Sequence, residues 1–99
     1  MSKIQNQEID QLFEAILSLQ SVEECYKFFE DACTIKEINE IAQRFEVACR
    51  LDAGQNYQEV NKETGASTAT ICRVNKCLNY GNEGYRTVID RLKKEGKLS

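Results

Sequence analysis

The chain has 99 residues, with 13 Lys and Arg, 16 Asp and Glu, no His, and a formal net charge of −3 at pH 7. This length predicts a single domain, residues 1–99, with a modest core. There is no apolar stretch of membrane-spanning length and no signal-peptide pattern at the N-terminus, so we expect a cytoplasmic protein. Without His, a phosphate loop or a nucleophile elbow, an enzyme is the least expected class, and we expect no cofactor or metal.

The N-terminal half is predicted to form amphipathic helices, because apolar residues recur there at spacings of three and four. The first stripe comprises Ile9, Leu12, Phe13, Ile16 and Leu17, and the second comprises Val22, Cys25, Tyr26 and Phe29. Thr34 and Glu37 have the spacing of a capping box and predict the start of a long third helix. The predicted buried face of that helix is Ile38, Ile41, Ala42, Phe45 and Cys49.

Residues 57–78 predict two short helices joined by a tight turn. Asn56 can cap the first helix, and Glu59 can reach back to its amide as in a capping box. Gly65 stands where the chain must turn sharply, a place where positive φ costs little only for glycine. Ser67 is then placed to cap the second helix. Two helices so joined are typical of a helix-turn-helix, whose second helix can lie in the major groove of DNA.

The second of these helices has two unlike faces. Its inward residues are predicted to be Ile71, Val74 and Leu78, which pack with Val60 of the first helix. The opposite face carries small and cationic side chains, Thr68, Ala69, Cys72, Arg73 and Lys76. Small residues let a helix lie deep in a groove, and cations neutralise phosphates.

These faces predict separate roles at DNA. We predict base-edge contacts from Thr68, Ala69 and Cys72, and phosphate contacts from Arg73 and Lys76. Backbone or flanking-base contacts are predicted from Gln58 and Asn61 on the first helix of the motif.

An ordinary helical hairpin is the alternative interpretation of this segment. Asn61 and Thr64 favour it, because helix-turn-helix units usually have apolar residues at both positions. The charge distribution favours DNA binding: residues 1–54 carry a net charge of −6, whereas residues 55–99 carry +3. The positive half contains the predicted DNA-binding motif, and the local sign of charge matters more than the net charge for a phosphate footprint.

The C-terminal segment predicts one more amphipathic helix after a loop flanked by Gly81 and Gly84. Its apolar side comprises Tyr85, Val88, Ile89 and Leu92. Six helices result, so the fold class is all-α. The five cysteines form no CxxC pair, which indicates reduced structural thiols rather than zinc ligands.

The run from Thr64 to Leu78, TGASTATICRVNKCL, resembles the DNA-reading segment of the Trp repressor family, most of all its YerC/YecD-type branch. Gly65-Ala66, Ala69-Thr70-Ile71 and Arg73 carry the resemblance, which extends back over Thr34 to Gly54. It implies a six-helix Trp-repressor-like fold in an intertwined homodimer. It also implies a transcriptional regulator that represses an amino-acid biosynthesis or metabolism operon by binding a palindromic operator.

The same resemblance implies an amino-acid corepressor site. It places Arg44 and Arg73 at the two positions that sandwich the ligand, and Thr34 and Thr70 at two further pocket positions. Val74 departs from the family pattern, which has glycine there to leave room for an indole. Tryptophan is therefore not the expected ligand, and histidine is a candidate because relatives on this branch are associated with its biosynthesis. The alternative role of both arginines is ion pairing or phosphate contact.

Several apolar stripes on so short a chain independently favour a homodimer, although a monomeric bundle stays open. Two further function classes also stay open. One is a DNA-binding protein that needs no effector. The other is a helical protein-interaction module that reads no DNA and uses the acidic N-terminal half, with Glu23-Glu24 and Glu30-Asp31 as the natural surface.

Overall fold

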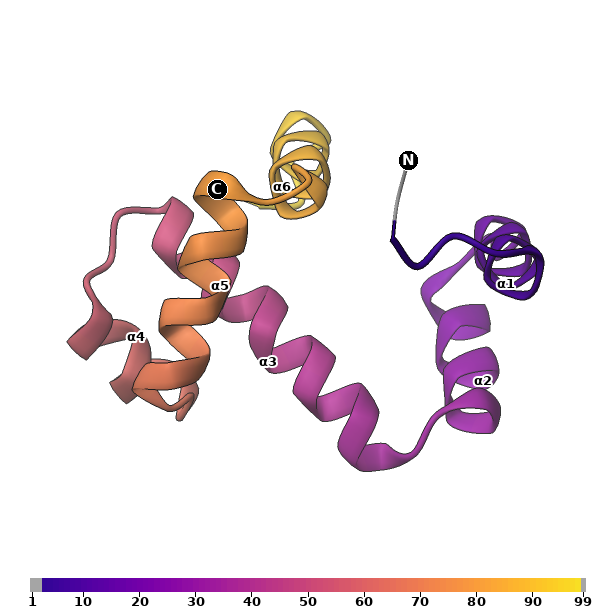
Figure 1. The fold of residues 1–99 in the computed structure, drawn as a ribbon, viewed down its shortest axis with the longest axis horizontal. Coiled ribbons are helices and arrows are strands. Elements are labelled where there is room, and N and C mark those ends of the chain that lie inside the picture. The colour runs from indigo at the N-terminus through magenta and orange to yellow at the C-terminus, as the bar shows by residue number, and fades with distance from the viewer. Residues whose placement is uncertain (1–2, 99) are drawn as a thin grey trace. The chain divides into compact units, whose positions relative to one another are not determined.

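The computed structural model describes residues 3–98, which form six α-helices (Figure 1). They are α1 (Gln7–Leu17), α2 (Val22–Ala32), α3 (Ile35–Asp52), α4 (Tyr57–Thr64), α5 (Thr68–Tyr80) and α6 (Gly84–Lys94). The all-α prediction is thus confirmed. The chain divides into two compact units, one ending at Ile38 and the other beginning at Asn39.

The first unit contains α1, α2 and the start of α3, and each helix begins with a side-chain cap. Asn6 Oδ1 accepts a hydrogen bond from the amide of Ile9 at 2.8 Å, and Ser21 Oγ accepts one from the amide of Glu24 at 3.1 Å. The predicted capping box of α3 is present: Thr34 N donates to Glu37 Oε1 at 2.8 Å, and Glu37 N donates to Thr34 Oγ1 at 3.1 Å.

Neither α1 nor α2 contains a buried residue. Several large apolar side chains of this unit are exposed instead, with Leu17 at 79% and Val22 at 74%. Helices of this kind gain most of their stability from packing of the apolar face. Within its described residues, 3–38, the first unit therefore encloses no core of its own and presents apolar helix faces.

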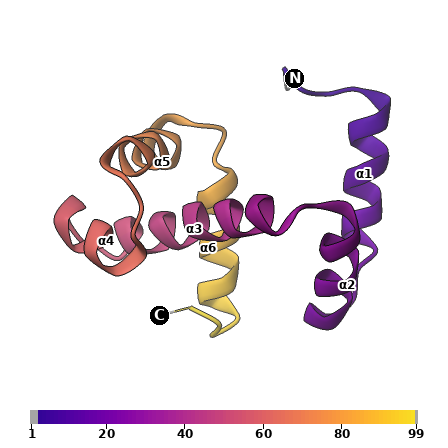
Figure 2. The same ribbon diagram turned by 90° about the horizontal axis from the view of Figure 1, so that it is seen from below.

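The second unit contains the core of the chain, made by the rest of α3 together with α4, α5 and α6 (Figure 2). Its buried residues are all apolar: Val47, Ala48, Val60, Ala66, Ile71, Val74, Leu78 and Ile89. The predicted inward residues of α4 and α5 all belong to this cluster. In α6, Ile89 of the predicted stripe is buried, whereas Val88 is 45% exposed.

The prediction for the buried face of α3 is wrong at Ile41 and Ala42. Val47 and Ala48 are the buried residues of α3, whereas Ile41 is 51% exposed and Ala42 is also exposed. Phe45 and Cys49 pack against the core from its edge. The reason is that the core contacts the C-terminal half of α3, from Phe45 to Leu51, whereas Ile41 and Ala42 lie nearer the N-terminus of the helix.

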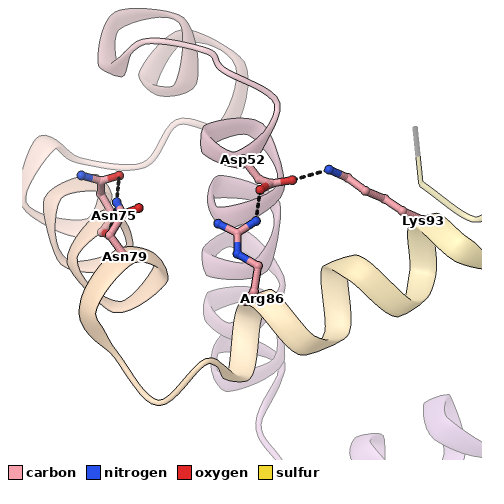
Figure 3. Close-up of polar contacts among 5 residues, drawn as sticks. All are labelled: Asp52, Asn75, Asn79, Arg86 and Lys93. Atoms are coloured by element: carbon pink, nitrogen blue, oxygen red, sulfur yellow. Dashed lines mark hydrogen bonds and ion pairs between the residues drawn. The ribbon is translucent and has the colours of Figure 1, made fainter.

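The Asp52 carboxylate joins the end of α3 to α6 (Figure 3). The Asp52 side chain is 8% exposed and accepts hydrogen bonds from Arg86 and Lys93. The bond from Lys93, followed by that from Arg86, lowers the pKa of Asp52. Asp52 in turn raises the pKa of Arg86. The cluster thus holds α6 against the helix that leads into α4.

The connection from α5 to α6 is a tight loop with two constrained positions. Gly81 ends α5, and a Cβ there would lie 2.4 Å from the carbonyl oxygen of Cys77, so only glycine fits. Glu83 precedes α6 with φ 66°, in the left-handed region, and its side chain makes no capping hydrogen bond. The conformation of Glu83 costs free energy because its Cβ is crowded there.

Candidate nucleic-acid interface

The N-terminus of α4 is fixed by a reciprocal capping box. Asn56 Oδ1 accepts from the amide of Glu59 at 2.9 Å, and Glu59 Oε1 accepts from the amide of Asn56 at 3.2 Å. Val60 follows on the inner face and is 0% exposed. These three residues confirm the predicted start of the motif and orient α4 against the core.

The turn between α4 and α5 is closed by glycine and by two polar side chains. Gly65 has φ 73° and its amide donates to Asn61 O at 2.9 Å. Asn61 Nδ2 donates to Ala66 O at 2.7 Å. Thr64 Oγ1 donates to Val60 O at 2.7 Å and accepts from the amide of Ala66 at 3.1 Å.

These bonds give Asn61 and Thr64 a structural role that the sequence did not reveal. The two residues take positions that usually hold apolar side chains in this motif. Here they satisfy backbone groups of the turn, and a satisfied polar group avoids the cost of desolvation. Their polarity is therefore compatible with a helix-turn-helix.

Helix α5 begins at a capped N-terminus and separates its two faces as predicted. Ser67 Oγ accepts from the amide of Thr70 at 3.2 Å. The inner residues Ile71 and Val74 are 0% and 1% exposed. The outer residues are all exposed, namely Thr68, Ala69, Cys72, Arg73 and Lys76. The structure thus brings the predicted contact residues of α5 to one accessible surface.

The remaining predicted DNA contacts lie on α4. Gln58 and Asn61 are exposed, and the amide nitrogen of Asn61 is engaged with the turn. At the start of the same helix, partial burial, and then a hydrogen bond with Cys72, raises the pKa of Tyr57. This contact places the first residue of α4 beside the outer face of α5.

The predicted ligand-binding residues lie in different environments. Thr34 belongs to the first unit, where it caps α3. The other four belong to the second unit. Arg44 is half-buried and Arg73 is exposed, whereas Val74 is 1% exposed within the core. The Thr70 hydroxyl lies 3.1 Å from Ser67 Oγ, which donates to it.

Two surface hollows of about 450 Å³ occur in the second unit. One is lined by Ala42, Phe45, Glu46, Cys49, Arg50, Ala53, Ile89, Lys93 and Leu98, and the other by Phe45, Cys77, Gly81, Asn82, Gly84, Tyr85 and Val88. Neither is lined by the predicted ligand residues. Burial at the first hollow, and then the charges of Asp52 and Glu46, raises the pKa of the Cys49 thiol.

Residues 3–98 contain neither a metal-binding group nor a membrane-spanning helix. Across residues 3–98, the side chains of His, Cys, Asp and Glu form no group of three or more that could hold a metal ion. Among the helices in that range, none is both long and apolar enough to cross a membrane.

One residue that contacts the motif from α3 was not predicted from the sequence. Gln43 of α3 donates from Nε2 to the carbonyl oxygen of Thr64 at 3.2 Å. The two residues are 21 positions apart. A glutamine in a helix carries no local signal for such a contact, because the partner is a backbone group of a distant turn.

The fold and this interface define a class of protein, an all-α helix-turn-helix protein with an exposed second helix. The family model described as "Trp repressor protein" matches residues 7–93. The chain belongs to the Trp repressor family. It is 55% identical over 93 residues to the "Uncharacterized protein YerC" of Bacillus subtilis (strain 168), which covers 94% of this chain and 89% of that protein.

Solved structures show the same relationship. A TrpR-like protein from Eubacterium eligens ATCC 27750 is 52% identical, with a TM-score of 0.88 over 98% of this chain and 97% of that one. A candidate Trp repressor from Staphylococcus aureus is 45% identical, with a TM-score of 0.88 over 92% and 91% of the two chains. The six-helix fold is therefore that of TrpR-like proteins. This is a family of regulators rather than enzymes, and membership suggests a DNA-binding regulator.

Proposed function

We propose that this protein is a dimeric, sequence-specific DNA-binding regulator that represses an amino-acid biosynthesis operon. The observation that carries the proposal is the division of α5 into a buried face and an exposed face of small and cationic side chains. Ser67 caps the exposed N-terminus of this helix, and Gly65 sets the turn before it. Family membership supports the same function.

The residues of this surface divide by chemistry. Thr68, Ala69 and Cys72 are short enough to let α5 approach base edges, so they are assigned to base contact. Arg73 and Lys76 are assigned to phosphates, because phosphate contacts position a protein on the duplex but do not distinguish one base sequence from another. Gln58 and Asn61 on α4 are assigned to the DNA backbone or flanking bases.

The dimer is supported by the first unit. A segment this short does not bury enough apolar surface to be stable alone, and α1 and α2 contain no buried residue. A second copy would cover these helix faces. Two recognition helices about one turn of DNA apart would then read a palindrome.

An amino-acid effector is the next part of the proposal. Arg44 and Arg73 are the candidate cations, because a guanidinium pairs with a carboxylate or stacks on a flat ring. Thr34 and Thr70 are the candidate polar partners. The burial of Val74 in the core argues against a bulky indole beside Arg73 and leaves a smaller ring such as that of histidine as the candidate.

A second candidate function is regulation without any effector. The same observation favours it: Val74 already fills core space beside α5, so a ligand need not brace the helix. Under this candidate, Arg73 contacts phosphate only.

The first experiment selects bound duplexes from fragmented genomic DNA, with and without a mixture of the twenty amino acids. Enrichment of a palindrome only with the mixture would support the effector. Equal enrichment in both arms would support regulation without an effector from that mixture. Enrichment of no sequence would contradict sequence-specific DNA binding.

The second experiment tests the interface itself with the selected duplex. Thr68→Glu places an anion against DNA, and we expect loss of operator binding in a gel-shift assay with the dimer still folded. Thr87→Glu is the matched control, since Thr87 is an exposed threonine on α6 and the charge change is the same. Equal binding by Thr68→Glu and the unaltered protein would remove this face of α5 from the interface.

A further inference from the structure

The turn between α4 and α5 is closed by hydrogen bonds from Asn61 and Thr64, and a hydrogen bond from Gln43 ties it to α3. We propose that Gln43, Asn61 and Thr64 form a polar latch that fixes the direction of α5 relative to α3. We further propose that discrimination between the operator and other DNA depends on this latch. The inference rests on the proposed function, because it concerns how the DNA-reading helix is positioned.

The first part of the latch closes the turn from within. The Thr64 hydroxyl donates to Val60 O and accepts from the amide of Ala66, so one side chain bridges the last turn of α4 and the chain that enters α5. Asn61 Nδ2 adds a bond to Ala66 O at 2.7 Å. Ala66 is 1% exposed, so both of its backbone groups are held at a buried point of the turn.

The second part ties this turn to α3. The last carbonyl groups of a helix lack partners within the helix and must find them elsewhere. The carbonyl of Thr64, the final residue of α4, accepts from Gln43 Nε2 at 3.2 Å. Gln43 is half-buried and lies in the same helix as Val47 and Ala48, which pack in the core. The hydrogen bond from Gln43 thereby fixes the position of the turn relative to the core.

A fixed direction of α5 matters more for recognition of the base sequence than for contacts with the phosphates. Phosphate contacts are made by long, flexible cations and tolerate small rotations of the helix. Base contacts depend on short side chains at the groove floor, and a small tilt of α5 removes them. Loss of the latch is therefore expected to lower operator binding and to leave non-specific binding unchanged.

The test compares Gln43→Met with the unaltered dimer. Methionine has nearly the same length and shape but cannot donate the hydrogen bond. Operator affinity should fall roughly 3- to 10-fold, the effect of one hydrogen bond, while affinity for random-sequence duplex and the slope of affinity against salt stay the same. Gln5→Met is the matched control, because Gln5 is exposed in the segment before α1.

Two further measurements separate positioning from general destabilisation. Thr64→Val removes the bridging hydroxyl and should also lower the ratio of operator to random-sequence affinity. In both variants, hydrogen exchange should quicken at the amides of Gly65 and Ala66 and stay unchanged in α6. Loss of folded protein would instead lower both affinities together.

The proposal is overturned if Gln43→Met and Thr64→Val keep the operator preference of the unaltered protein. It is also overturned if both affinities fall equally. If the unaltered dimer shows no operator preference, the proposed function fails and this inference fails with it. An unaltered dimer that discriminates, together with variants that discriminate equally well, rejects the latch alone.

Discussion

Replacing Val74 by glycine tests whether the Val74 side chain of α5 fills the space that a bound tryptophan would need. The Val74 side chain is 1% exposed and packs in the cluster that contains Ile71 and Ile89. Val74→Gly removes the whole side chain from this cluster. It also places glycine inside a helix of 13 residues.

Two costs add in this variant. Burial of a valine side chain is worth about 1.5–3 kcal/mol, and glycine within a helix costs about 1 kcal/mol relative to alanine. The expected loss in the free energy of unfolding is therefore about 2.5–4 kcal/mol. For a domain of this size, such a loss lowers the melting temperature by roughly 10–30 °C. Val74→Ala keeps the Cβ and should show most of the burial cost without the glycine cost.

Thermal unfolding and calorimetry with tryptophan together check the reasoning. The unaltered protein should not bind tryptophan, whereas Val74→Gly should bind it detectably and regain part of its melting temperature by mass action. An unchanged melting temperature for Val74→Gly would refute the packing of Val74 in the core. Binding of tryptophan by the unaltered protein would refute the steric argument.

Two further predictions concern the elements around α6. Arg86 and Lys93 lower the pKa of Asp52, so its contribution to stability is present above the unfolded value of 3.8 and lost as the pH falls through the lower folded value. Asp52→Asn should therefore cost about 1–2 kcal/mol at neutral pH, because both cations are partly exposed, and the two proteins should converge once the pH is below the lowered folded pKa of Asp52. Urea unfolding at each pH measures this difference, and a constant difference down to low pH would contradict the ion-pair account. Glu83→Gly should raise the free energy of unfolding by about 1 kcal/mol, because glycine adopts φ 66° without strain. Glu83→Gln is its control for the lost charge, and an equal gain in both variants would assign the effect to charge instead.

Local signals explain which parts of the motif could be predicted from the sequence. The caps at Asn56, Thr34 and Ser67 depend on side chains within three residues of the groups they bind. The turn at Gly65 depends on one residue and its φ angle. Such features are encoded where they occur, so the boundaries of α4 and α5 followed from the residues alone.

The roles of Asn61 and Thr64 could not be predicted in the same way. Their polarity favoured an ordinary hairpin while the turn geometry was unknown. In the folded turn, the amide and the carbonyl group of Ala66 both need hydrogen-bond partners. The side chains of Thr64 and Asn61 supply them. The link from Gln43 to Thr64 was equally hidden, because it joins a side chain to a carbonyl in another helix.

The sequence by itself determined the six helices, the caps that start α3, α4 and α5, and the two faces of α5, because hydrogen bonds and apolar periodicity within one helix need no distant partner. Tertiary structure alone decided which part of α3 is buried, since the core covers Val47 and Ala48 but leaves Ile41 of the predicted stripe 51% exposed. It alone also decided the pairing of Asp52 with Arg86 and Lys93. Contacts of this kind depend on how helices pack, and packing sums weak interactions over residues far apart in the chain.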